Sequence, residues 1–489
     1  MSLGWACWWT LVRTCVLCLC AWPICIGVER WLRQVSDRWR PLAFGLLLAP
    51  FLFPELLVGY TYRGPALSSS RVAEWLCTVL LLLRIVPIGV VTLLASPPGL
   101  ASASALYCRW MLVRQSGFSL RELARLLACI WNDPVRRVLP ALGLMALVAF
   151  QEFELAALLQ TASWTDWFIA AQRVGLDRNE MLAHSSWPVV MQLPLVLGIV
   201  NWAVYRQTPH VEANHELRLS ARNHGMAWLY LAVALTGGCL IPLIFLGSNL
   251  LSGLRLMLVQ RTQLLGLSHE VVIAVAISLT AGLATWGMSG RFLRSQQGSR
   301  FVRIGLQGVL LPGLAGSLLL SLAVSRLFQQ PWFRPFYDTP IPWVIAVTVW
   351  LFPRAVLVRL WLEATQSGEG LYLASLLTNG AGRTKESMES LAAAQAEIPR
   401  PTRLAGSLAF RLRDQPRLLA IGLLCYWAYL DLSTAYLLAP TGMPSGLVRL
   451  YNFMHFGRSA ALSAEAFAFF GMPIALLCLA IGIMRLFRS

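Results

Sequence analysis

The sequence predicts an all-α, polytopic integral membrane protein with about eleven transmembrane helices in two parallel repeats. Of its 489 residues, 57% are hydrophobic and only 13% are charged, and the mean hydropathy is +0.62. About eleven stretches contain roughly 20 mainly apolar residues, the length that a helix needs to cross a hydrocarbon core about 30 Å thick. Landmarks of the first half also return in the second half in the same order. These three observations argue against a soluble protein of this length.

The predicted transmembrane helices share this length and apolar character. They cover residues 5–27, 41–60, 75–95, 138–159, 186–205, 226–250, 268–289, 304–327, 341–362, 417–438 and 464–485. The first is interpreted as a retained helix, because its apolar core is longer than that of a signal peptide and no small-x-small cleavage site follows. Arg13 within it is expected to reach the interface or to face protein.

An internal duplication is indicated by residue pairs whose separation grows in small steps along the chain. The pairs are Pro54 and Pro312 at 258 residues, Pro87 and Pro353 at 266, and both Glu152 with Asp431 and Pro194 with Pro473 at 279. The expected units are residues 1–215, with helices one to five, and 216–489, with an extra sixth helix followed by helices seven to eleven. Because one extra helix separates the five-helix repeats, they should be parallel, with a pathway between them.

The distribution of arginine predicts the orientation. The loops 28–40, 96–137, 206–225, 290–303 and 363–416 carry four, six, three, four and six basic residues, whereas the alternate loops carry two or fewer. The positive-inside rule therefore places the N-terminus outside and the C-terminus in the cytoplasm, in a multi-pass protein of a cell (inner) membrane. The same distribution explains the net charge of +17 without a nucleic-acid partner, because the arginines lie singly in short loops.

Most of the eleven cysteines lie inside apolar segments, and we interpret them as small packing residues. Cys15 and Cys18 form a C-x-x-C motif, but no histidine or carboxylate accompanies them in the segment. The sequence therefore predicts no metal site and no cofactor.

Ionisable residues inside the predicted helices are candidates for a substrate pathway, because a charge in lipid costs several kcal/mol unless it is paired or faces water. The duplication relates Glu152 to Asp431, which should bring both acids toward the axis between the repeats. Lipid headgroups or water at the outer helix ends are the alternative surroundings for these acids. The pathway candidates are Glu152, Glu154, Asp431, Ser433 and Thr434, with Gln151, Glu55, Arg84 and Arg354 nearby.

Two cytoplasmic segments look suited to docking a partner. Residues 119–140 combine a helix cap at Ser119 with apolar residues at helical spacing and a proline before the next helix. Residues 386–413 supply a counterpart that is broken at Pro399 and Pro401. An amphipathic helix resting on lipid headgroups is the alternative interpretation.

These segments resemble the fused, double-length permease subunits of binding-protein-dependent ABC importers, in particular those for ferric iron. The first segment is similar to the cytoplasmic Glu-Ala-Ala signature of that family, and residues 430–466, with Asn452, His455 and Gly457, resemble its closing stretch. The chain departs from the family in its missing loop glycines and in lacking one helix. The resemblance implies these ATPase-docking residues: Glu122, Ala124, Arg125, Leu126, Ala128, Glu389 and Ala393.

The resemblance also implies partners. These are two copies of a cytoplasmic ABC ATPase and an extracytoplasmic solute-binding protein, in addition to the lipid bilayer. The chain itself is not expected to be an enzyme, since its only lysine, Lys385, is not part of a nucleotide-binding loop. Two other functions stay open: an ion- or proton-coupled secondary transporter, and a degenerate relative of permeases that does not transport.

Overall fold

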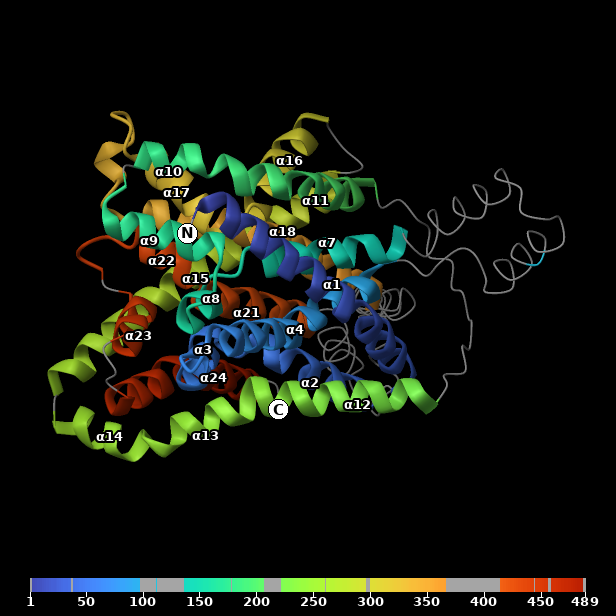
Figure 1. Cartoon of the computed structure of the whole chain (residues 1–489), viewed down its shortest axis with the longest axis horizontal. Helices are drawn as coiled ribbons and strands as arrows, with labels where there is room; N and C mark the ends of the chain where they lie inside the picture. Colours follow the sequence, from blue (N-terminus) through green and yellow to red (C-terminus); the bar gives the residue numbers. More distant parts are fainter. Residues whose placement is uncertain are drawn as a thin grey trace, which may run out of the picture.

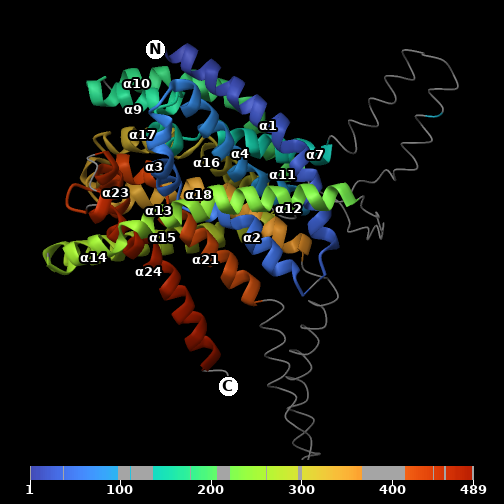
Figure 2. The same ribbon diagram turned by 60° about the horizontal axis from the view of Figure 1, so that its bottom comes forward.

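The computed structural model describes residues 2–36, 38–96, 111, 136–176, 178–205, 221–259, 261–295, 300–365, 414–443, 445–455 and 459–486. All regular elements in these ranges are helices, so the predicted all-α class is confirmed. Figure 1 shows them packed into one bundle, and Figure 2 shows the two termini at opposite ends of it.

The first half of the bundle begins with a long helix and continues through two interrupted ones. Its helices are α1 (Leu3–Gln34), α2 (Arg40–Leu52), α3 (Glu55–Ala66), α4 (Ser70–Ala95), α7 (Arg136–Phe150), α8 (Glu154–Leu159), α9 (Trp164–Val174), α10 (Arg178–His184) and α11 (Ser186–Tyr205). Helix α1 packs against α4, α7 and α12, which makes it an integral part of the bundle.

A helical connection lies between the halves. It consists of α12 (Ala221–Leu235), the π-helical turn η2 (Thr236–Leu240), α13 (Ile241–Ser248) and α14 (Leu250–Val259). These elements follow one another along the lower edge of Figure 1, beside α24.

The second half has a similar order of long and interrupted helices. Its helices are α15 (Arg261–Ser295), α16 (Arg300–Leu314), α17 (Ser317–Phe328), the short 3-10 turn η3 (Arg334–Phe336), α18 (Pro340–Thr365), α21 (Gln415–Tyr429), α22 (Leu432–Leu438), α23 (Gly446–His455) and α24 (Ser459–Leu486). Helices α4 and α18 pack against each other, so they join the two halves.

Each predicted transmembrane range contains helix, but four of the eleven ranges are interrupted. The breaks separate α2 from α3, α7 from α8, α16 from α17, and α21 from α22. Pro54 precedes the first residue of α3, where its ring cannot continue the helix of α2, and a glycine with positive φ, Gly316, precedes α17. The expectation of continuous helices is wrong at these four places.

Six helices are long and apolar enough to cross a membrane, or up to eight if each sharply bent pair is one span. The bent pairs are α2 with α3, at 62°, and α21 with α22, at 51°. The described part of the chain therefore contains several helices that are able to span a membrane. The number eleven and the orientation stay predictions.

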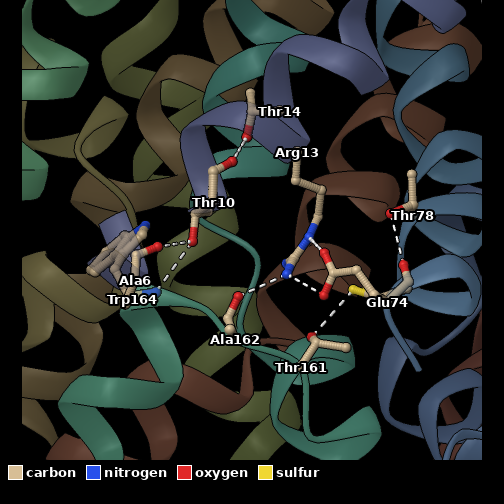
Figure 3. Close-up of polar contacts among 10 residues, drawn as sticks. Ala6, Thr10, Arg13, Thr14, Glu74, Thr78, Thr161, Ala162 and Trp164 are labelled. Carbon is tan, nitrogen blue, oxygen red and sulfur yellow. Dashed lines mark hydrogen bonds and ion pairs between the residues drawn. The ribbon is translucent and has the colours of Figure 1, made fainter. Parts of the chain in front are cut away.

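Arg13 connects α1 to the rest of the first half (Figure 3). Its Nε and Nη2 donate to the two carboxylate oxygens of Glu74 on α4 at 2.5 and 2.9 Å, and Nη2 also donates to the Ala162 carbonyl at 2.7 Å. Only 5% of the Arg13 side chain is exposed. The alternative that this arginine faces protein is therefore the correct one, and its charge is compensated inside the bundle.

Candidate functional site

The four helix breaks surround one cavity of about 110 Å³. Residues from both halves line it: Phe51, Leu52, Glu55, Arg84, Val148, Gln151, Glu152, Phe153, Glu154, Ser317, Trp350, Arg354, Trp427, Leu430, Asp431 and Ser433. Four carboxylates and two guanidiniums are among them, which leaves a formal charge of −2 when all are ionised. Charged residues grouped among apolar helices mark this cavity as the candidate functional site.

Each break separates two shorter helices, which we call half-helices. The second half-helix of each pair begins at this cavity with, or directly after, an acidic or hydroxyl residue. Glu55 is the first residue of α3, Glu154 the first of α8 and Ser317 the first of α17, while Asp431 directly precedes α22. The first backbone N–H groups of a helix have no partner within it, and they carry its partial positive charge. The carboxylates therefore lie where the backbone stabilises negative charge.

Arg84 fixes the break between α2 and α3. Its guanidinium forms an ion pair with Glu55 and donates to the carbonyls of Phe53 at 2.8 Å and Phe51 at 3.1 Å. These carbonyls lie at the end of α2, where backbone acceptors lose their helical partners. Arg84 thus donates to carbonyls at the end of α2 that lack helical partners, and it also forms an ion pair with Glu55, the first residue of α3.

Glu152 is built into the break between α7 and α8. Its Oε1 accepts a hydrogen bond of 2.6 Å from the Leu155 N–H, and its carbonyl accepts one of 2.7 Å from Thr165 Oγ1. The side chain also interacts with the carboxyl of Glu55. With 7% of its surface exposed, Glu152 is a buried residue of the cavity wall.

Asp431 directly precedes α22 and is as buried as Glu152, at 7% exposed. Thr434 Oγ1 donates a hydrogen bond to its carboxylate. The Glu154 carboxylate, from the first half of the chain, faces the backbone N–H of Leu432. Glu154 and Asp431 therefore both lie at the N-terminus of α22.

Gln151 supports the remaining break, between α16 and α17. Its Nε2 lies 2.6 Å from the carbonyl of Leu314, the last residue of α16, and 2.6 Å from Gln192 Oε1. The Gln151 amide, which belongs to the first half of the chain, therefore donates a hydrogen bond to the last carbonyl of α16 in the second half.

Aromatic rings form another part of the wall. Phe51 of α2 meets Trp427 of α21 edge to face, with ring centroids 4.9 Å apart. The Arg354 guanidinium carbon lies 3.9 Å from the centroid of Trp350 and 5.2 Å from that of Trp427. The second arginine of the cavity is thus held by ring faces.

The structure brings most of the predicted pathway residues together. Glu152, Glu154, Asp431 and Ser433 all line the cavity, whereas Thr434 contributes indirectly through its hydrogen bond to Asp431. The headgroup alternative does not describe Glu152 and Asp431, because both are buried among helices. Among the described residues, no group of three or more His, Cys, Asp or Glu side chains is arranged to hold a metal ion.

Sequence reasoning did not identify the aromatic wall or Ser317 as parts of the site. Trp350 lies four residues before Arg354 and could have been recognised as a ring within helical reach of a buried cation. The predicted docking residues lie outside the described part of the chain: Glu122, Ala124, Arg125, Leu126, Ala128, Glu389 and Ala393.

The fold and the site describe a helical protein with several possible membrane spans and a charged cavity between its halves. No protein-family model, curated protein or solved structure matches this chain.

Proposed function

We propose that the chain is the permease subunit of an ABC importer, which moves a small solute across the cell membrane through this cavity. A binding protein would deliver the solute outside, and two copies of a separate ATPase would supply the energy. The observation that carries the proposal is the convergence of Glu152, Glu154 and Asp431 on one cavity at the ends of half-helices from both halves. Discontinuous helices around a polar site are typical of transporters.

The order of the helices supports two parallel repeats. In each half, a long helix and an interrupted helix precede a 26-residue helix, which is α4 in the first half and α18 in the second. A 15-residue helix, a break and a short helix of six or seven residues follow in both, as α7 with α8 and α21 with α22. Two parallel repeats of this kind imply an axis along the membrane normal, and the contact between α4 and α18 is a suitable position for it.

Transport would follow from movement of one half against the other. The cavity wall is divided between the halves, so a rotation at the contact of α4 and α18 would separate Glu154 from the start of α22. The predicted docking segments, residues 119–137 and 386–413, precede α7 and α21. A rigid helix there would transmit closure of the ATPase dimer to the break between α7 and α8 and to the break between α21 and α22. Ferric iron is the substrate that the family resemblance favours.

A double substitution tests the proposal. In membranes that take up the solute, Glu152→Gln with Asp431→Asn should abolish uptake while membrane insertion persists. Glu29→Gln is the matched control, because Glu29 is a buried acid of α1 that pairs with Arg33 and does not line the cavity. Uptake at the wild-type rate in the double variant would end the assignment of the pathway.

The ATPase partner requires its own test. Cysteines placed at positions 122–130 should crosslink to an ATPase in native membranes. Uncoupling of ATP hydrolysis from uptake by Leu126→Asp would support the same contact. If crosslinking never captures an ATPase, the coupling role fails and a permease relative without transport becomes the better interpretation.

A proton-coupled secondary carrier is the second candidate function. The lining of the cavity by Glu55, Glu152, Glu154 and Asp431 favours it, because chains of carboxyl groups inside a helical bundle are typical of proton relays in carriers. Collapse of uptake with a protonophore while ATP persists would support this function over the ABC importer.

A further inference from the structure

Arg354 is held in the cavity in an unusual way for a buried cation. Its guanidinium lies over the rings of Trp350 and Trp427, and its Nη1 donates to the Trp350 carbonyl at 2.8 Å. The charges of Asp431 and Glu55 act on it. Within the described parts of the chain, however, no carboxylate forms an ion pair with it.

Arg84 shows what a fixed arginine looks like in the same cavity. It combines an ion pair to Glu55 with hydrogen bonds to two carbonyls at the end of α2. Moving Arg84 would leave a helix end and a carboxylate without partners, which is costly inside a protein. Moving Arg354 would break one hydrogen bond to its own helix, expose two ring faces and remove a positive charge from near Asp431 and Glu55, and an incoming cation would restore that charge. Of the two arginines, Arg354 is therefore the one whose guanidinium an incoming cation can displace.

The surroundings of Arg354 have the chemistry of a site for organic cations. Flat aromatic faces attract ammonium and guanidinium groups through the ring quadrupole, and nearby carboxylates add to that attraction. When its four carboxylates are ionised, the cavity has a formal charge of −2 even with both of its arginines counted, so one more positive charge is favoured. A hard metal ion would gain nothing from ring faces, because it binds through oxygen ligands.

We propose that the Arg354 guanidinium occupies a binding position for the solute. The cavity binds a small organic cation whose guanidinium or ammonium group replaces that of Arg354 over Trp350 and Trp427. This inference rests on the proposed function in placing the cavity on a solute pathway, and it names the class of substrate. An arriving cation would take over the ring faces while the flexible Arg354 side chain withdraws. The volume of about 110 Å³ limits the solute to a small molecule.

The test is direct binding of methylguanidine to the purified full-length protein in detergent, measured by isothermal titration calorimetry. Methylguanidine reproduces the end of the Arg354 side chain. Arg354→Met vacates the ring faces and should bind methylguanidine about tenfold more tightly than the wild type. Arg354→Lys keeps a tethered cation and should bind like the wild type. Adding Trp350→Leu to Arg354→Met should remove the gain.

Arg359→Met is the matched control. Arg359 lies on the same helix, α18, with its guanidinium carbon 3.7 Å from the Trp286 ring, but it does not line the cavity. This variant should bind methylguanidine like the wild type. Should Arg354→Met not fold, as judged by gel filtration and circular dichroism, Arg354→Gln makes the same test with a polar neutral side chain.

Equal affinities in the wild type, the neutral Arg354 variant and Arg359→Met would overturn the proposal, as would binding of ferric citrate or glutamate in preference to methylguanidine. Calorimetry requires neither an ATPase nor uptake, so the two proposals fail separately. Binding without uptake would count against the transport function alone. Uptake of iron without binding of methylguanidine would count against the organic-cation site alone.

Discussion

Replacing Gly316 with alanine should destabilise the bundle by disturbing the break between α16 and α17. Gly316 has φ +103° and ψ 155°, a combination that is essentially restricted to glycine. A Cβ added there would lie 2.9 Å from Cδ of Gln151, closer than such atoms normally approach. Gln151 is the residue whose amide donates to the Leu314 carbonyl at the end of α16. The substitution therefore strains the backbone and displaces a side chain that satisfies a helix end.

The expected loss follows from these two effects. Backbone strain of this kind costs about 1–3 kcal/mol. Loss of the hydrogen bond from Gln151 to Leu314 adds about 1 kcal/mol. The free energy of unfolding should therefore fall by roughly 2–4 kcal/mol.

Chemical denaturation of the detergent-solubilised protein measures this difference. A double-mutant cycle with Gln151→Ala separates the two effects, because the side chain that meets the new Cβ is then absent. In that background Gly316→Ala should cost only the backbone strain. Gly308→Ala is the control: Gly308 lies within α16, and a Cβ there would meet no atom within 4 Å. This control should be neutral or stabilising by up to about 1 kcal/mol, because alanine favours helix.

Two results would refute the reasoning. If Gly316→Ala costs no more than Gly308→Ala, the positive φ does not constrain this position. If its cost is the same with and without the Gln151 side chain, the close contact contributes nothing and the Leu314 carbonyl does not depend on it.

Two further predictions concern other polar contacts. Arg13→Met should lower the free energy of unfolding by about 3 kcal/mol, because it leaves Glu74 and the Ala162 carbonyl without their donor; combining it with Glu74→Gln should recover part of that loss in the same denaturation experiment. At the loop before α18, hydrogen bonds from the backbone N–H and hydroxyl of Thr441 lower the pKa of the Asp338 carboxyl, so its stabilising contribution is present above the unfolded pKa of about 4 and is lost as the pH falls through the lowered folded pKa. Thermal unfolding of Asp338→Asn should accordingly differ from the wild type near neutral pH and converge with it in acid, and a constant difference across the acid range would contradict this assignment.

The sequence by itself determined the helical class and the position of nearly every long helix, because membrane-length apolar stretches are a local property of the chain. It also singled out Glu152 and Asp431, because an acid inside an apolar stretch is unusual wherever it occurs. The separation of 279 residues that Glu152 and Asp431 share with Pro194 and Pro473 indicates from the sequence that these two acids are counterparts.

Only the tertiary structure decided where the helices break and what meets there. An apolar stretch has the same composition whether its helix is continuous or interrupted, so residues 304–327 gave no sign that Gln151, far away in the sequence, would satisfy the end of α16. The placement of Arg354 over Trp427 likewise joins residues of two different helices. Such contacts depend on how helices pack, and hydropathy along a chain does not encode which side chains face each other across a cavity.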